Sequence, residues 1–278
     1  MLMMLFRNAL LYLVAAFLLF PRPATAAGQD LNTALMEATF RISGPTGVSG
    51  AVSAGTVFFL VRPGAKAAGR QALVMVTAAH ILAGIAGDDA VLLLRKRAQD
   101  SGFSSFEHTI KIRDRGVPLW TAPPDADVAV LPLTLPAEAH VALLSPDLLA
   151  TDDVMARYEI HPGDELLSLG YPYGLPANAA GFPVLRSGKI ASYPIIPAKR
   201  HRTLLYDFQV HSGNSGGPVY FSASSRTYGG LHKVGEINFI AGLVSRQAIV
   251  EGRPLELAAV IPAQFIREAF DRLAGSVR

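Results

Sequence analysis

Short apolar segments alternate with turn residues along most of the chain, and this pattern predicts many short β-strands. Strands are expected at residues 55–61, 73–76, 91–94, 128–131, 165–169, 184–192, 204–208, 218–221, 237–245 and 258–260. The polar stretch 95–116 is expected to contain a hairpin. Residues 222–235 are rich in serine and glycine and are predicted to form a loop.

The pattern changes at the end of the chain, where residues 262–273 place apolar side chains at helical spacing after Pro262. This predicts a short amphipathic helix, which we expect to dock on the second half. Residues 134–160 are mixed in character and are expected to connect two halves. We therefore expect a first β domain over 27–145, and a second over 146–278 that includes the terminal helix.

The first residues are typical of a secretory signal peptide. Arg7 precedes an apolar run over 9–20, and small residues follow at 24–27. We expect residues 1–26 to be removed, with cleavage after Ala26 or Ala27. The run is shorter than the roughly 20 residues that span a bilayer, so no stable membrane insertion is expected after removal. An uncleaved anchor is the alternative. The predicted location is the periplasm or the exterior of a bacterial cell.

Half of the 278 residues are hydrophobic and 17% are charged, so the chain can bury a large core. Loss of residues 1–26 would remove Arg7 and Arg22 and no acidic residue. The 25 basic residues would fall to 23, against 22 acidic ones, and no nucleic-acid partner is expected. The chain has no cysteine. This excludes a thiol nucleophile and cysteine-based zinc sites, and it is compatible with export.

Arg95, Lys96 and Arg97 form a dense basic cluster, which we expect to be a solvated loop or strand edge. All histidines except His80 lack the paired spacing of metal ligands, so no metal or cofactor is expected. These histidines are His108, His140, His161, His201, His211 and His232. His211 is close to Ser215 in the sequence and could line a pocket beside this serine. A plain hydrogen-bonded role is the favoured interpretation for each of them.

Three motifs carry candidate chemistry. Ser215 lies in Gly-Asn-Ser-Gly-Gly-Pro at 213–218, where a hydroxyl can be exposed while backbone N–H groups converge on one point. Upstream, Thr-Ala-Ala-His ends at His80, and Asp127 precedes the apolar run 128–131. A base, an acid and a nucleophile thus appear in the order His, Asp, Ser, which is a known order of the serine-hydrolase triad.

These motifs resemble those of the chymotrypsin/trypsin-like serine peptidases. Leu-Gly-Tyr-Pro-Tyr-Gly-Leu at 169–175 and Arg-Ser-Gly-Lys-Ile-Ala-Ser at 186–192 resemble segments of the bacterial HtrA-type branch. The chain ends soon after the terminal helix, so the PDZ domain usual in that branch is not expected. The resemblance covers about residues 40–275. It implies an all-β fold of two antiparallel six-stranded β-barrels with a C-terminal α-helix and an active site in the cleft between them.

The resemblance also implies roles for the motif residues. Ser215 would attack the substrate carbonyl, and His80 would take its proton. Asp127 would orient the imidazole, and the N–H groups of Gly213 and Ser215 would form the oxyanion hole. Asp125 is a rival for the acid. Asp127 is favoured because it directly adjoins the apolar strand.

A polypeptide substrate is implied, and its preferred residue before the scissile bond (P1) can be predicted. Gln209 stands six residues before the nucleophile, where the family places the pocket floor, and it carries no negative charge. Glutamyl peptidases of this fold use a histidine at the position of Val244 and a hydroxyl residue at that of Val210, and neither is present. An uncharged P1 residue is therefore predicted.

The segment 240–245 matches the strand that pairs with bound peptide in this family. Ser245 occupies the place of a serine that contacts the catalytic aspartate, and Gln247 follows it in the substrate-binding region. An ordinary buried strand that ends in a polar residue is the alternative. Asn214 stands where the digestive enzymes carry an aspartate that pairs with a newly cleaved N-terminus. No such activation step is expected here.

Two other functions compete with that of a peptidase. The esterase nucleophile elbow also has the pattern Gly-x-Ser-x-Gly, but it needs an acid and then a histidine after the serine. Only His232 follows Ser215, and no acid lies between them. The second alternative is a catalytically latent trypsin-like fold that acts as a peptide-binding or chaperone module.

Overall fold

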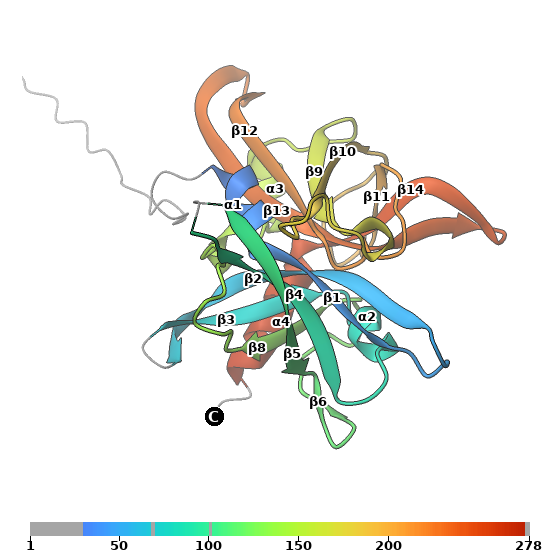
Figure 1. Cartoon of the computed structure of the whole chain (residues 1–278). Coiled ribbons are helices and arrows are strands. Elements are labelled where there is room, and N and C mark those ends of the chain that lie inside the picture. The colour runs from blue at the N-terminus through green and yellow to red at the C-terminus, as the bar shows by residue number, and fades with distance from the viewer. Residues whose placement is uncertain (1–29, 68–69, 100–101, 276–278) are drawn as a thin grey trace, which may run out of the picture.

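A computed structural model describes residues 30–67, 70–99 and 102–275 of the chain (Figure 1). The predicted signal peptide at 1–26 lies outside the described residues. The helices are α1 (Leu31–Ala38), α2 (Ala79–Gly84), α3 (Asp152–Arg157) and α4 (Ala263–Gly275), with two 3₁₀ turns, η1 (Pro146–Leu148) and η2 (Pro172–Gly174). The strands are β1 (Thr39–Pro45), β2 (Val52–Ala67), β3 (Arg70–Thr77), β4 (Asp89–Arg97), β5 (Phe103–Lys111), β6 (Arg113–Asp114), β7 (Val117–Pro118), β8 (Ala129–Leu133), β9 (Glu165–Gly170), β10 (Val184–Ile190), β11 (Leu204–Asp207), β12 (Pro218–Tyr228), β13 (Leu231–Val250) and β14 (Arg253–Pro262).

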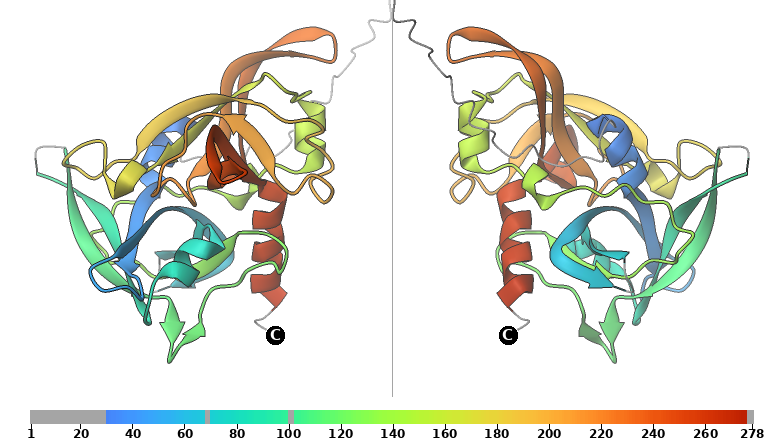
Figure 2. Two further views of the ribbon diagram at one scale, coloured as in Figure 1. Left: turned by 90° about the vertical axis from the view of Figure 1, so that its right-hand side faces the viewer. Right: turned by 90° about the vertical axis from the view of Figure 1, so that its left-hand side faces the viewer.

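Two antiparallel sheets of six strands form the body of the molecule, and they confirm the predicted fold class. The first sheet has the order β5-β4-β1-β2-β3-β8, and the second closes into a barrel in the order β10-β11-β14-β13-β12-β9. Each sheet encloses its own apolar core. The two halves lie one above the other in Figure 1, and the first sheet curls round its core in the views of Figure 2.

Helix α4 contacts the second half as expected, through β13 and β14, and it also completes the core of the first sheet. Its apolar residues Phe265, Ile266 and Ala269 belong to the same buried cluster as Phe58 of β2. The helix contacts β8 as well as β13 and β14. Strand β8 lies at one edge of the first sheet and has no further strand beside it. Helix α4 covers the apolar surface at this edge.

The segment 222–235 was wrongly predicted as a loop, because it forms the arms of the β12–β13 hairpin. The chain turns at Gly229 and Gly230, whose φ angles of 59° and 72° lie in the left-handed region. A turn with two such residues matches the twist of the flanking strands. The serines lie on the half-exposed arms, where polar side chains are tolerated. Helices α1 and α3 and strand β1 were not predicted.

Arg95 is fully buried, so the expectation of a solvated basic cluster was wrong for this residue. Its guanidinium carbon lies 4.0 Å from the ring centroid of Phe40 and 4.3 Å from that of Phe182. Its two Nη atoms donate to the Tyr171 hydroxyl and to backbone carbonyls; the acceptor carbonyls are those of Met36, Glu37, Thr39 and Gly181. Burial lowers the pKa of Arg95, but hydrogen bonds and aromatic faces replace its hydration shell.

Candidate active site

His80 is presented by the short helix α2, which begins directly after β3. Strand β3 pairs with β8 so that Thr77 lies opposite Ala129. His80 follows the first of these residues by three positions, and Asp127 precedes the second by two. The pairing of two neighbouring strands therefore brings the base and acid candidates to the same end of the first sheet.

Asp127 holds His80 through both of its carboxylate oxygens. Oδ1 accepts a hydrogen bond of 3.0 Å from the His80 backbone N–H, and Oδ2 lies 2.7 Å from the ring nitrogen Nδ1. Asp125 does not take this place, because its carboxylate instead lies 3.3 Å from the Arg202 guanidinium. A proton on Nδ1 leaves the other ring nitrogen of neutral His80 as a proton acceptor.

Ser245 joins this pair from the second half of the molecule. Its hydroxyl is buried on β13 and donates a 2.5 Å hydrogen bond to Asp127 Oδ2. Burial by itself raises the pKa of Asp127, but the hydrogen bonds from His80 and Ser245 outweigh this and lower it from 3.8 to about 2. The carboxylate is thus an anion at neutral pH and can stabilise a protonated imidazole.

Ser215 lies in a tight loop that both halves hold in place. Its carbonyl accepts a 2.8 Å hydrogen bond from Thr56 N on β2. The next residue, Gly216, donates from its N–H to Val244 O at 2.7 Å, one position before Ser245. These bonds place the Ser215 loop between β2 of the first half and β13, the strand that carries Ser245.

No hydrogen bond joins the Ser215 hydroxyl to the His80 ring, both of which are described residues. Such contacts are often long before substrate binds.

The peptide unit between Ser212 and Gly213 is oriented by a neighbouring loop. Tyr173 N donates a 2.6 Å hydrogen bond to Ser212 O. The N–H and C=O of a trans peptide point in opposite directions, so the Gly213 N–H points away from Tyr173. Neither Gly213 N nor Ser215 N donates a backbone hydrogen bond within the described ranges. Two amides of the nucleophile loop are therefore available for an oxyanion.

Glycine is required at two positions of this loop. Gly213 has a φ of 95°, and a Cβ atom there would collide with the carbonyl of Tyr171. Gly216 has a φ of 89°, and its Cβ would collide with Thr56 O and with the hydroxyl of Thr77. The glycines that flank Ser215 thus permit both the backbone conformation and the close packing against the first half.

The residues predicted to bind substrate fall into two groups. Val210 and Val244 are buried in the core of the second barrel. Gln209 is exposed, and its Nε2 lies 3.5 Å from Oε1 of Glu256 on β14. Gln247 Nε2 donates to Leu255 O at 3.0 Å, across the β13–β14 hairpin. The proximity of Glu256 to Gln209 was missed, because it depends on the pairing of distant strands.

His211 stacks on Tyr173 beside the nucleophile loop. Their ring centroids are 4.7 Å apart, with an interplanar angle of 23°, and the Tyr173 hydroxyl lies 3.1 Å from His211 Nδ1. Tyr173 is 69% exposed. The contact agrees with a hydrogen-bonded role for His211. The contact of Tyr173 N–H with Ser212 could not be predicted from its segment Tyr-Pro-Tyr-Gly, because it joins two distant loops.

Asn214 is buried, and its Oδ1 has no hydrogen-bond partner among the described residues. Its side chain packs against Gly170, where a Cβ atom would lie 3.3 Å from Oδ1. A neutral amide is tolerated in such a site far better than a carboxylate, which would need a cation. The environment of Asn214 therefore suits the residue that the chain carries.

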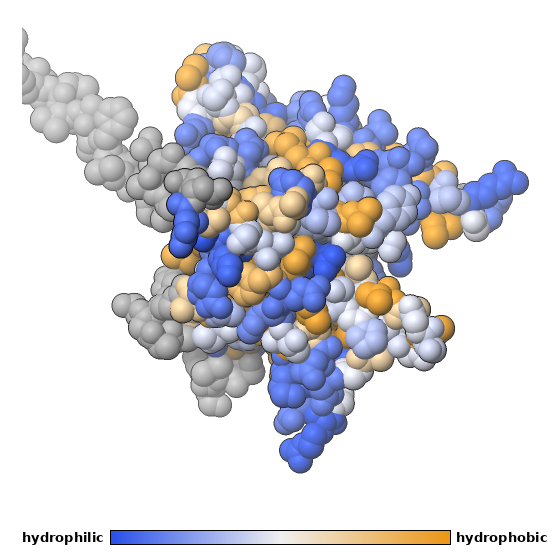
Figure 3. Space-filling model, in the orientation of Figure 1, coloured by the Kyte–Doolittle hydropathy of each residue, from blue (hydrophilic) through white to orange (hydrophobic). Residues whose placement is uncertain are grey.

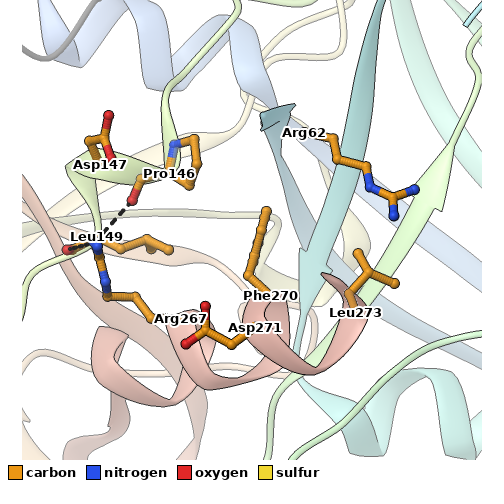
Figure 4. A pocket seen from close by; sticks show the side chains of 8 residues that line it. All are labelled: Arg62, Pro146, Asp147, Leu149, Arg267, Phe270, Asp271 and Leu273. Atoms are coloured by element: carbon orange, nitrogen blue, oxygen red, sulfur yellow. Dashed lines mark hydrogen bonds between the residues drawn. The ribbon is translucent and has the colours of Figure 1, made fainter. Parts of the chain in front are cut away.

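A cavity of about 280 Å³ lies between helix α4 and the turn η1, apart from these groups (Figure 4). It is lined by Arg62, Pro146, Asp147, Leu149, Arg267, Phe270, Asp271 and Leu273. In the part of the chain that the structure describes, no cluster of side chains suits a metal ion, and no helix is long and apolar enough to cross a membrane. The face seen in Figure 3 mixes apolar and polar groups without a broad apolar area.

Comparison with solved structures shows the same fold in other proteases. The HtrA-type protease AlgW with a tripeptide matches with a TM-score of 0.50 and 17% identity, over 85% of this chain and 60% of the AlgW chain. AlgW with a decapeptide matches with a TM-score of 0.50 and 15% identity, over 87% and 66%. The protease Anisep from Arthrobacter nicotinovorans matches with a TM-score of 0.50 and 15% identity, over 86% and 96%. The chain thus spans about 60% of the first of these structures.

No curated protein sequence matches the chain significantly. The family comparison is more informative, because the trypsin-like peptidase domain matches residues 55–229, which is more than half of the chain. The matched range includes His80, Asp127 and Ser215. The chain belongs to the family of the trypsin-like peptidase domain.

Proposed function

We propose that this protein is a serine endopeptidase that hydrolyses peptide bonds through Ser215, His80 and Asp127. The observation that carries the proposal is the hydrogen-bonded series from Ser245 through Asp127 to His80. This series holds the His80 imidazole in one orientation and favours the tautomer with its proton on Nδ1. Family membership supports a peptidase, and the geometry supports the serine type.

In the first half of the reaction, Ser215 Oγ attacks the substrate carbonyl while His80 takes the hydroxyl proton. The carbonyl oxygen becomes an oxyanion, which accepts hydrogen bonds from the N–H groups of Gly213 and Ser215. Asp127 stabilises the imidazolium. The carbon–nitrogen bond then breaks, the His80 proton passes to the leaving amine, and an acyl-enzyme remains.

In the second half, a water molecule loses a proton to His80 and attacks the acyl carbonyl. The same two N–H groups stabilise the second oxyanion. The bond to Ser215 Oγ breaks, and His80 returns its proton to that oxygen. The products are a carboxylic acid and the free enzyme, and no cofactor enters the balance.

The proposed substrate is a polypeptide, and strand β13 supports this. Pairing with β12 ends at Leu243, and Val244 bonds Gly216 and Gly217 of the nucleophile loop. Arg246 and Gln247 pair only with β14 within the described chain. The other edge of β13 after Val244 can therefore accept an extended peptide by strand addition. We propose an uncharged P1 residue, because Gln209 is neutral. A cleavage profile dominated by lysine or arginine would overturn this preference and point to Glu256 instead.

The proposed function can be tested by reaction with a fluorophosphonate, which reacts with activated serines. The protein should be labelled once per chain, Ser215→Ala should not be labelled, and Ser222→Ala on β12 should be labelled as the wild type is. Ser222 is a matched control because its hydroxyl bonds Asn238 instead of a triad residue. An unfolded protein substrate should be cleaved by the wild type and by Ser222→Ala, but not by Ser215→Ala.

The missing hydrogen bond between Ser215 and His80 gives one specific reason to keep the second candidate, a latent trypsin-like fold that binds peptides or acts as a chaperone. Folded protein that resists the fluorophosphonate under all conditions, but binds unfolded polypeptide, would favour this second function. Labelling of Ser215 in the wild type would exclude it.

We also propose that the protein is exported from a bacterial cell. The basic residue, the apolar run and the small-residue site at 1–27 support this location. Expression with the native leader in a bacterial host should yield a product that begins at Ala27 or Gly28, found outside the cytoplasm. Uncleaved protein that stays in the cytoplasmic fraction would contradict it.

A further inference from the structure

We propose that Thr56 is a positioning residue for the oxyanion hole, an inference that rests on the proposed peptidase function. Thr56 lies on β2 in the first half of the molecule and is fully buried. The oxyanion hole belongs to the second half. Its orientation would therefore depend on one hydroxyl that reaches it from the opposite half.

The Thr56 hydroxyl bridges two segments of the second half. It donates a 2.7 Å hydrogen bond to Gly213 O and accepts one of 3.2 Å from Tyr171 N. Gly213 carries one of the two oxyanion amides. Tyr171 begins the loop that contains Tyr173, whose N–H orients Ser212. A single oxygen atom thus connects the nucleophile loop with the loop that sets its orientation.

Glycine has more conformational freedom than other residues, and hydrogen bonds on both sides of Gly213 limit that freedom. Both peptide units that flank Gly213 are held by their carbonyls, Ser212 O by Tyr173 N and Gly213 O by the Thr56 hydroxyl. With both planes fixed, the Gly213 N–H has one direction. Without the hydroxyl, a glycine with a φ of 95° can rotate and withdraw this donor.

The backbone of Thr56 reinforces this link. Its N–H donates to Ser215 O at 2.8 Å, and its carbonyl accepts from the Thr77 hydroxyl at 2.7 Å. Thr77 ends β3, three residues before His80. The main chain of Thr56 thus joins the nucleophile to the strand that leads to the base. The side chain alone contacts the carbonyl of Gly213.

Valine tests the hydroxyl because it has nearly the same shape but neither donates nor accepts hydrogen bonds. Thr56→Val would leave Tyr171 N–H and Gly213 C=O unpaired in a buried site, and these groups would reorient to find other partners. We expect kcat on a peptide substrate to fall by about tenfold to a hundredfold, with KM within about twofold. Thr56→Ser keeps the oxygen and should retain activity close to that of the wild type.

Thr39→Val is the matched control. Thr39 is as buried as Thr56, but its hydroxyl has no hydrogen-bond partner among the described residues, so its loss should leave kcat unchanged. Inhibition by a peptidyl boronic acid supplies a second readout, because its tetrahedral adduct also carries an oxyanion. Its inhibition constant should rise in Thr56→Val by the same factor as kcat falls. If Thr56→Val does not fold, Thr56→Ala provides the same comparison in a less crowded site.

If the role of Thr56 were purely structural, Thr56→Val would have a lower melting temperature but an unchanged kcat per active site. Active-site titration gives the number of active sites for this comparison. An unchanged kcat, or equal boronic-acid inhibition of all variants, would overturn the inference while leaving the proposed function intact. A wild-type protein that neither cleaves peptides nor reacts with a fluorophosphonate would overturn the proposed function, and this inference with it.

Discussion

Ser245 Oγ and His80 Nδ1 meet the same oxygen of Asp127, Oδ2, at 2.5 Å and 2.7 Å. One donor comes from β13 in the second half and the other from α2 in the first. The carboxylate is thus held from both halves, and the orientation of the imidazole depends on their correct docking.

Ser245→Ala removes one of these donors and should lower kcat by about tenfold, which corresponds to the loss of one hydrogen bond to a charged group. The pKa of Asp127 should rise toward its ordinary value, because the hydrogen bond that lowers it is gone. Steady-state kinetics with a peptide substrate gives the first quantity. Ser222→Ala, which removes a hydroxyl elsewhere on the second barrel, should leave kcat unchanged. A Ser245→Ala enzyme with full activity would contradict the prediction.

Exchange of either aspartate for asparagine separates the two acid candidates. Asp127→Asn should reduce kcat by a factor on the order of 10⁴, because an amide can favour the wrong imidazole tautomer. Asp125→Asn should retain activity within about threefold, because Asp125 pairs with Arg202 on the surface. The measurement is the turnover of the two purified variants under the same conditions. The reverse order of activities would assign the acid to Asp125.

The lowered pKa of Asp127 predicts a pH dependence of stability. The carboxylate titrates at about 2 in the folded protein and near 3.8 when unperturbed. Its contribution is therefore fully present above pH 3.8 and is lost as the pH falls to about 2. A shift of this size corresponds to about 2 kcal/mol of unfolding free energy.

Urea unfolding of the inactive Ser215→Ala protein, with and without Asp127→Asn, measures this contribution. The stability advantage of the aspartate form over the asparagine form should shrink through the window from pH 3.8 to 2. A constant difference across that window would show that the hydrogen bonds do not stabilise the carboxylate in the folded state.

Arg95→Met should lower the free energy of unfolding by about 3 kcal/mol or more, because several buried carbonyls lose their donor at once. Arg97→Met is the matched control on the same strand. Its side chain is 58% exposed, and its loss should change the free energy of unfolding by less than about 1 kcal/mol. Urea titration monitored by the fluorescence of Trp120 would compare them. Equal effects would mean that the buried contacts of Arg95 contribute little to stability.

The sequence predicted most of the second barrel's strands because their apolar residues are local and bounded by turn residues. The strand that carries Ser245 and the run that follows Asp127 were found in this way. The structure brings these residues together with His80, and their catalytic roles stay predictions. The motifs were informative because each adjoins the end of a strand, where the fold fixes the position of the side chains.

The features that were missed depend on contacts between distant segments. A run of three basic residues predicts side chains exposed to solvent, but Arg95 lies between Phe40 from β1 and Phe182 from the second half. The closeness of Glu256 to Gln209 depends on barrel pairing that no local pattern contains. The docking of α4 could not be read from its amphipathic spacing, which shows that one face is buried but not against which sheet.

Helix α4 also bears on the order of folding. The apolar core of the first sheet begins with strands near residue 40 and is completed by Phe265 and Ile266. A ribosome delivers α4 after every strand of both sheets, so the first half cannot reach its final packing until α4 has emerged. The hydrogen bond from Ser245 to Asp127 needs both halves in their final positions. Assembly of the candidate active site is therefore a late event in folding, because it must wait for a helix that follows every strand.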